Sequence, residues 1–395
     1  MDLSEMVMES PEGVSKLCEF CVEFVTWIAK PGHGDEFRRV PRPGQRTCSF
    51  CEMIFREAFR YWYQQNRIIA QDNNCEPVLR AGLDDHDFTS IWRASSRRRG
   101  DQARICQVTV QRNCFPQLTR EFAVWADEGS PACQTLVNRP PILGPYMNDV
   151  CALADSWLSE CKSHAECPSM DVTILPTRVL VLSRADKNSQ IGIRLMESNG
   201  RKGRYIALSH CWGPEDKMPL RTTKTNLQEH LSNIAFDQLG KTFQEVVMFA
   251  YCASIDLVWI DSLCILQGDN SDWHKEAQAM RDAYRNAALV VLASGARDGS
   301  EGLFIADREP AVRYRMPYVH DKVKNGVFNL AVYPSGEIDP TLSPLHYRAW
   351  AFQERLLARR IVAFMSGGIS WDCKGMKIDE CGHHRSFWLF ENQSW

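Results

Sequence analysis

The sequence lacks several features that would place a protein in a functional class at once. It has no run of about 18 apolar residues, so we expect no membrane-spanning helix. Its first residues are acidic and lack the basic and apolar regions of a secretory signal. The formal net charge is only −3, which argues against a protein that coats nucleic acid or an anionic membrane. We therefore expect a cytoplasmic protein that binds no nucleic acid.

Common catalytic motifs are also missing. No G-x-G-x-x-G follows a predicted strand, and the Gly-rich stretch 295–302 has no Walker lysine. No G-x-S-x-G nucleophile turn occurs either. Ser209 and His210 are neighbours on a predicted strand, so their side chains point to opposite faces. The sequence therefore argues against a conventional dinucleotide fold and against a Ser–His hydrolase.

Cysteine, in contrast, is abundant, with 16 residues in a chain of 395. Two C-x-x-C pairs near the N-terminus offer four thiolates, which is enough for a tetrahedral structural zinc site: Cys18, Cys21, Cys48 and Cys51. The alternative is four reduced structural thiols, and His33 is a further candidate ligand. Cys161, His164 and Cys167 lie three residues apart. They indicate either a second metal site or a helix end that packs Trp157 and Leu158 on the core.

The central region predicts an α/β unit. Apolar runs at 205–212, 257–263 and 288–295 are typical of strands buried on both faces, and amphipathic helical patterns separate them. One helix follows T-F-Q-E (242–245), which we interpret as a capping box between Thr242 and Glu245. We predict a parallel sheet flanked by helices, preceded by a Cys-rich, mainly irregular and helical N-terminal domain.

Ligands of parallel sheets gather at the carboxyl ends of the strands. The candidate binding residues there are Ser209, His210, Trp212, Gly213, Asp261 and Ser262. Glu276 falls in the first turns of the next helix, at the edge of its apolar face and three residues after Trp273. It is either a catalytic carboxylate or a structural one paired with Arg348 or Arg355. The segment R-A-W-A-F-Q-E-R is predicted to hold the residues at the carboxyl ends of the strands in place; we call this edge of the sheet the rim. Its supporting residues are Arg348, Trp350, Gln353, Glu354 and Arg355.

Five segments, in this order, resemble fungal heterokaryon incompatibility (HET) domain proteins. They are Y-I-A-L-S-H-C-W-G (205–213), T-F-Q-E-V-V (242–247), L-V-W-I-D-S-L-C-I-L-Q (257–267), D-W-H-K-E-A-Q-A-M-R-D-A-Y-R-N-A (272–287) and R-A-W-A-F-Q-E-R-L-L-A-R-R-I (348–361). We therefore expect a Cys-rich domain at 1–170, a HET domain at 171–365 with its core at 205–355, and a C-terminal extension at 366–395.

The resemblance implies a role in non-self recognition, in which incompatible cell fusion triggers programmed cell death as a form of innate immunity. HET domains also look similar to Toll/interleukin-1 receptor-like (TIR-like) domains, some of which cleave NAD with a Glu that follows a Trp. By that analogy Glu276 is the candidate catalytic residue, NAD the candidate substrate, and Trp212 or Trp273 a stacking surface. The alternative is a non-catalytic death-signalling module that assembles with itself or with an incompatibility partner protein. The sequence leaves open whether the protein is an enzyme.

Overall fold

The computed structural model describes residues 7–10, 13–29, 36–39, 48, 50, 90–99, 102–112, 118–134, 136, 139–140, 142, 147–169, 172–183, 191–304, 313–320, 323–332, 343–348 and 350–382. It divides into two compact units, which are described separately. The first contains residues 1–141, 309–335 and 381–383. The second contains 142–308, 336–380 and 384–395. In the part of the chain that is described, no helix is both long and apolar enough to cross a membrane.

The first unit is built around an antiparallel sheet. Its strand order is β2-β1-β14-β15-β6-β5-β4-β3. Its elements, in chain order, are β1 (Val7–Ser10), β2 (Gly13–Lys16), α1 (Glu19–Ala29), β3 (Glu36–Arg39), β4 (Ser90–Arg99), β5 (Gln102–Arg112), β6 (Leu118–Trp125), the 3-10 helix η2 (Pro131–Gln134), β14 (Arg313–His320) and β15 (Val323–Val332). The prediction of a mainly irregular and helical domain is therefore wrong for these residues. Two inner strands of this sheet, β14 and β15, come from far along the chain, and local sequence patterns cannot reveal such a pairing.

The second unit contains a mixed sheet with helices packed on it. Its strands are β8 (Arg178–Ser183), β9 (Gly192–Glu197), β11 (Ile206–Ser209), β12 (Leu257–Ile260), β13 (Leu289–Leu292), β16 (Arg360–Met365), β17 (Gly368–Cys373) and β18 (Lys377–Asp379). A separate two-stranded sheet pairs β7 (Thr173–Ile174) with β10 (Lys202–Gly203). The helices are α5 (Met147–Cys161), η3 (Glu215–Lys217), α6 (Leu227–Ser232), η4 (Phe236–Gln238), α7 (Lys241–Cys252), α8 (Asp261–Cys264), α9 (Asn270–Asn286), η6 (Pro344–Tyr347) and α10 (Ala351–Leu357).

The centre of this sheet is parallel. The full order is β18-β17-β16-β13-β11-β12-β8-β9. β11 runs parallel to both β12 and β13, and β13 runs parallel to β16, whereas the outer strands pair antiparallel. All four residues of β11 and of β13 are buried, as their continuous apolar sequences predict. The α/β class predicted from the sequence is thus confirmed, whereas the antiparallel outer strands were not predicted.

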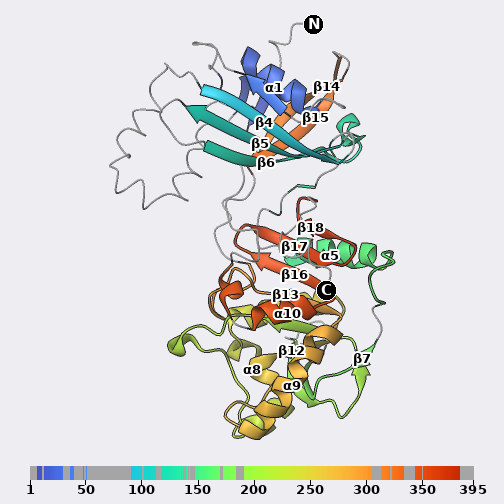
Figure 1. Ribbon diagram of the computed structural model, residues 1–395, viewed down its shortest axis with the longest axis vertical. Coiled ribbons are helices and arrows are strands. Elements are labelled where there is room, and N and C mark those ends of the chain that lie inside the picture. The colour runs from blue at the N-terminus through green and yellow to red at the C-terminus, as the bar shows by residue number, and fades with distance from the viewer. Residues whose placement is uncertain are drawn as a thin grey trace. The chain divides into compact units, whose positions relative to one another are not determined.

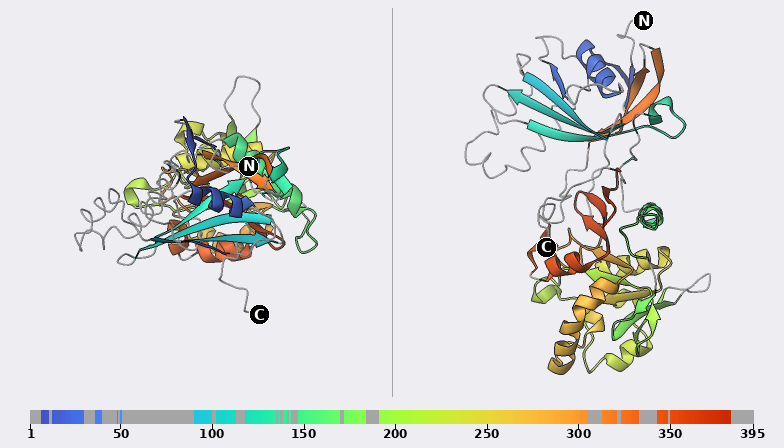
Figure 2. Two further views of the ribbon diagram at one scale, coloured as in Figure 1. Left: turned by 90° about the horizontal axis from the view of Figure 1, so that it is seen from above. Right: turned by 45° about the vertical axis from the view of Figure 1, so that its right-hand side comes forward.

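Helices cover both faces of the sheet. α9 and α10 contact each other and are labelled in Figure 1; α5 and α7 also contact each other. The right-hand view of Figure 2 shows α5 and α9 on opposite sides of the sheet. α5 belongs to the second unit, which begins at Ile142. The sequence pattern had assigned residues 1–170 to a separate domain.

Candidate functional site

Polar side chains converge where β11 and β12 end. Asp261, the first residue of α8, is buried and accepts hydrogen bonds from the Ser262 backbone N–H at 2.7 Å and the Trp212 indole N–H at 2.9 Å. Arg348 Nη2 and His210 Nδ1 each lie 3.8 Å from an Asp261 carboxylate oxygen. The carboxyl ends of neighbouring parallel strands meet at one edge of a sheet, which explains why these distant residues come together.

Glu354 of α10 completes this group from another part of the chain. Its carboxylate is buried and its Oε2 accepts a short hydrogen bond from the Ser209 hydroxyl. Its Oε1 has no hydrogen-bond partner among the described residues. Burial raises the pKa of Glu354, and the Ser209 hydrogen bond acts in the opposite direction. We call Ser209, His210, Trp212, Asp261, Arg348 and Glu354 the Asp261 cluster.

His210 is the most deeply buried titratable group in the Asp261 cluster. Its ring packs edge-on against Phe243, with 4.9 Å between the ring centroids. Neither ring nitrogen has a hydrogen-bond partner among the described residues. Burial lowers the pKa of His210 to about 4, while Asp261 acts in the opposite direction and Arg348 adds to the lowering. The ring is therefore neutral at physiological pH.

This burial predicts a pH dependence of stability that depends on His210. The unfolded chain binds a proton at His210 below about pH 6.5, whereas the folded chain does so only near pH 4. The contribution of His210 to the free energy of unfolding is therefore fully present above about pH 6.5. It decreases as the pH falls, by about 2 kcal/mol at about pH 5. His210→Gln is expected to lose less stability than the wild type between about pH 7.5 and about pH 5 in denaturant titrations.

The exposed His274 of α9 provides the control for this experiment. His274→Gln makes the same substitution outside the Asp261 cluster and is expected to keep the wild-type pH dependence. Glu354, whose pKa is raised, contributes a term of the opposite sign that all three proteins share. Equal pH dependence in wild type and His210→Gln would contradict the assignment.

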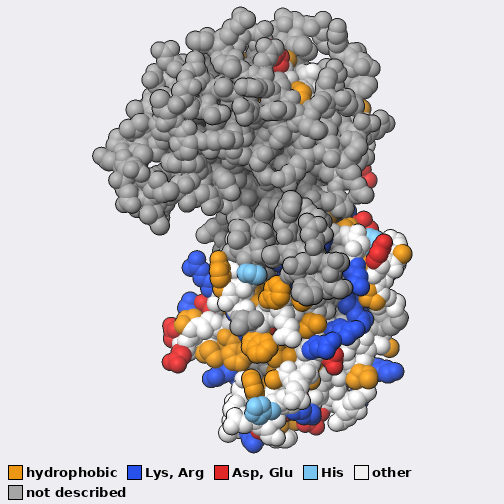
Figure 3. Space-filling view, viewed as in Figure 1, with side chains coloured by type: hydrophobic (Ala, Val, Ile, Leu, Met, Phe, Trp, Pro, Cys, Tyr) orange, Lys and Arg blue, Asp and Glu red, His pale blue; other side chains and the backbone are white. Residues whose placement is uncertain are grey.

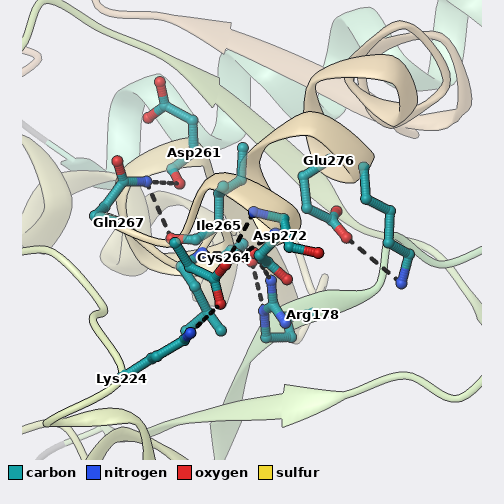
Figure 4. Close-up of polar contacts among 12 residues, drawn as sticks. Arg178, Lys224, Asp261, Cys264, Ile265, Gln267, Asp272 and Glu276 are labelled. Carbon is teal, nitrogen blue, oxygen red and sulfur yellow. Dashed lines mark hydrogen bonds and ion pairs between the residues drawn. The ribbon is translucent and has the colours of Figure 1, made fainter.

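Glu276 lies apart from the Asp261 cluster. It is buried, with 4% of its surface exposed, and its Oε1 has no hydrogen-bond partner among the described residues. Its one ion-pair contact in that part of the chain is Lys275 Nζ at 4.0 Å, so the Arg partner considered from the sequence is not found there. Figure 4 shows its carboxylate turned toward this lysine and away from Asp261. The carboxylate of Glu276 is therefore separate from the carboxylates of the Asp261 cluster.

Residues 205–354 match the family model described as heterokaryon incompatibility protein (HET). The chain contains a HET domain. The matched segment begins just before β11 and ends within α10, so it includes both Glu276 and the whole Asp261 cluster. Neither the curated proteins nor the solved structures include a significant match to the chain. The resemblance to heterokaryon incompatibility domain proteins that the sequence showed is confirmed.

The loop after β13 closes over part of the HET domain rim. Gly213 has φ +80°, and a Cβ built on it would lie 2.6 Å from Asp298 Cβ. Lys217 Nζ donates to Asp298 at 2.9 Å. Gly213 is thus a point of close packing between two loops, which leaves little space for a ligand at its α-carbon.

The predicted capping box has a different role in the structure. α7 begins at Lys241 after the N-cap Gly240, so Thr242 and Glu245 lie inside the helix. The Thr242 hydroxyl accepts from Gly302 N–H, and the Glu245 carboxylate accepts from the N–H groups of Leu303 and Phe304. These two side chains anchor the loop after β13, a function that the sequence interpretation missed because the partners lie about 60 residues away.

The remaining predicted rim residues are mostly at the surface. Trp273 and Trp350 are 49% and 55% exposed. Gln353 is exposed and Arg355 is half-buried. Of the polar block, only Arg348 and Glu354 lie within the Asp261 cluster.

Two groups of cysteines are arranged so that they could hold a metal ion. In the first unit, Cys48 Sγ lies 3.7 Å from Cys18 Sγ and 3.5 Å from Cys21 Sγ. The predicted fourth ligand, Cys51, and the alternative ligand His33 lie outside the described residues. In the second unit, Cys161, His164 and Cys167 meet Cys373, which the sequence interpretation did not include.

Proposed function

We propose that this protein acts in heterokaryon incompatibility in the cytoplasm, where its HET domain triggers programmed cell death by cleaving NAD. The reaction is hydrolysis of the N-glycosidic bond, in which NAD and water give ADP-ribose, nicotinamide and a proton. The match to the heterokaryon incompatibility family supports the biological role. The chemistry rests on the resemblance to TIR-like domains together with the position of Glu276.

The order of the parallel strands supports the proposed resemblance to TIR-like domains. Counted along the chain, β12, β11, β13 and β16 stand in the order 2-1-3-4. Flavodoxin-like sheets have this order and bind ligands beyond the carboxyl ends of their strands. The Asp261 cluster occupies that edge of the HET domain.

The catalytic proposal rests on one observation, the buried carboxylate of Glu276. A buried carboxylate with one oxygen free of described donors is costly unless it serves a purpose. Loss of nicotinamide builds positive charge on the ribose, and a fixed carboxylate stabilises that oxocarbenium-like state. Trp273 lies one helical turn before Glu276 and is half exposed, so its indole is available to stack on nicotinamide or adenine.

The Asp261 cluster is proposed to bind substrate and hold the rim in shape. Asp261 fixes the indole of Trp212 by the hydrogen bond from Nε1. Arg348, about a quarter exposed, contributes a cation that reaches solvent and attracts a phosphate. Ser209, His210 and Ser262 are buried and act by positioning their neighbours.

A second candidate function is favoured by an exposed apolar surface. Large apolar side chains are exposed on α9, on η6 and on α10 with its N-cap residue: Trp273, Tyr347, Trp350, Phe352 and Leu356. Figure 3 shows hydrophobic side chains gathered where Figure 1 labels α10. An apolar surface of this kind is typical of a protein-binding face. In this alternative the HET domain assembles with itself or with an incompatibility partner protein and performs no chemistry.

Nicotinamide release and cell killing together separate the two functions. The purified full chain is expected to release nicotinamide from NAD, and its expression in a fungal host is expected to kill cells while cellular NAD falls. Killing with no nicotinamide release and no loss of NAD would contradict the catalytic proposal and favour assembly. Neither killing nor NAD loss in an incompatible pairing would contradict both.

We also propose that Cys18, Cys21 and Cys48, together with Cys51, hold a structural zinc ion. The two sulfur–sulfur distances from Cys48, 3.5 and 3.7 Å, are close to those around a shared tetrahedral ion, and all three thiols lie within 4.8 Å of one another. Four thiolates leave no open position, so this ion would stabilise the first unit and take no part in catalysis.

A further inference from the structure

Three sulfur atoms and one imidazole nitrogen meet at the end of α5. Cys161 is the last residue of α5, His164 and Cys167 follow it in the next turns, and Cys373 is the last residue of β17. The four ligand atoms all lie within 4.8 Å of one another. We call these four residues the α5–β17 cluster. It belongs entirely to the second unit and lies outside the segment that matches the HET family model.

The separations fit a tetrahedral ion. His164 Nδ1 is 3.5 Å from Cys373 Sγ and 3.7 Å from Cys167 Sγ. Zinc bonds of about 2.3 Å to sulfur and about 2.1 Å to nitrogen place ligand atoms roughly 3.6–3.8 Å apart around a tetrahedron. Three cysteines and one histidine form one of the usual structural zinc sets.

The charge of the surroundings points to a metal-bound cluster. Arg360, the first residue of β16, is 2% exposed. Its Nε donates to Cys161 Sγ at 3.2 Å and its Nη2 donates to the Pro168 carbonyl. Among the described residues no carboxylate pairs with this guanidinium, and an unpaired buried cation is costly. Zinc with three thiolates and a neutral imidazole carries a net charge of −1, which would neutralise Arg360.

The turn after Cys373 is shaped to receive the histidine ring. Cys373 and Met376 exchange two backbone hydrogen bonds, at 2.8 and 3.3 Å. Gly375 lies between them, and a Cβ built on it would be only 2.5 Å from both Cγ and Nδ1 of His164. A side chain at 375 would therefore push the imidazole away from the thiols. The absence of a side chain there allows the turn to hold His164 next to Cys373.

We propose that Cys161, His164, Cys167 and Cys373 bind one structural zinc ion that ties α5 to the C-terminal strands of the sheet. The ligands from α5 and β17 are more than 200 residues apart. A bond across so long a loop removes much conformational freedom from the unfolded chain. Trp157 and Trp371 pack together beside the cluster, with 6.1 Å between ring centroids, so the metal would reinforce an existing contact between the same two elements.

Metal analysis of the purified full chain tests the proposal. Cys167→Ser and Cys373→Ser are each expected to lose one molar equivalent of zinc relative to the wild type. Cys252→Ser, a half-buried cysteine outside both clusters, is expected to lose none. Cys48→Ser distinguishes zinc bound by the N-terminal cysteines from zinc bound by the α5–β17 cluster. The losses of zinc caused by Cys48→Ser and Cys373→Ser should add in the double variant. Full zinc content in Cys373→Ser would overturn the proposal.

A measurement on the wild type covers the case in which a variant does not fold. Thiol alkylation is followed residue by residue with mass spectrometry, with and without a zinc chelator. Cys161, Cys167 and Cys373 are expected to react only after the chelator has removed the metal, and Cys252 is expected to react equally in both conditions. Equal reactivity of the three thiols in both conditions, or a disulfide between two of them, would contradict the zinc assignment.

Discussion

Replacing Glu276 by glutamine is expected to lower the rate of nicotinamide release by about 100- to 10,000-fold. Glutamine has nearly the same shape as glutamate but carries no charge to stabilise the positively charged ribose of the transition state. The KM for NAD should change little, because the carboxylate acts mainly on that transition state. Initial rates of nicotinamide release at several NAD concentrations measure both quantities.

The structure indicates that Glu276→Gln will fold. The one described ion-pair partner, Lys275, is 68% exposed, and exposed pairs contribute only about 0–1 kcal/mol. Asp282→Asn is the matched control, since Asp282 is an exposed carboxylate on the same helix. A thermal midpoint near that of the wild type, with unchanged turnover in Glu276→Gln, would show that Glu276 has no catalytic role.

Three of the four parallel strands of the sheet were accessible from the sequence because each of them is a local apolar run, whereas β16 was not predicted. The runs at 205–212, 257–263 and 288–295 correspond to β11, β12 and β13, and the helical pattern between the last two corresponds to α9. The two ends of α9 differ in burial. Its Tyr284 is buried, whereas its Trp273 is half exposed. The residue types alone do not show this difference.

Contacts between distant segments account for what the sequence interpretation missed. Thr242 and Glu245 have the spacing of a capping box, yet their hydrogen-bond partners belong to the loop after β13. Cys373 stands alone in the sequence, and only the antiparallel pairing of β16 with β17 brings it to the end of α5. In both cases the residue types indicated that the side chains bind a partner, but the identity of the partner depended on tertiary structure.

The Arg178–Asp272 pair shows how the rim of the HET domain is held together. Arg178 begins β8 and is almost fully buried; its Nε donates to the Cys264 carbonyl at 2.8 Å and its Nη2 forms a short ion pair with Asp272 of α9. The same Asp272 oxygen accepts from the Leu266 N–H at 2.8 Å. Figure 4 shows these groups converging between β8, α8 and α9. One ion pair thus connects three elements beside Glu276.

Arg178→Met is therefore expected to destabilise the HET domain by about 3–5 kcal/mol, because it leaves Asp272 without its cation in a largely buried position. Lys224→Met is the matched control. Lys224 lies 2.9 Å from Asp269 near the same helix end, but it is 71% exposed and should contribute only about 0–1 kcal/mol. Denaturant midpoints at an unchanged m-value measure both free energies of unfolding. Adding Asp272→Leu to Arg178→Met should restore part of the loss, since it removes the unpaired charge. Equal effects of Arg178→Met and Lys224→Met would mean that burial does not strengthen this pair, and that the packing of the sheet alone positions α9 and its carboxylate.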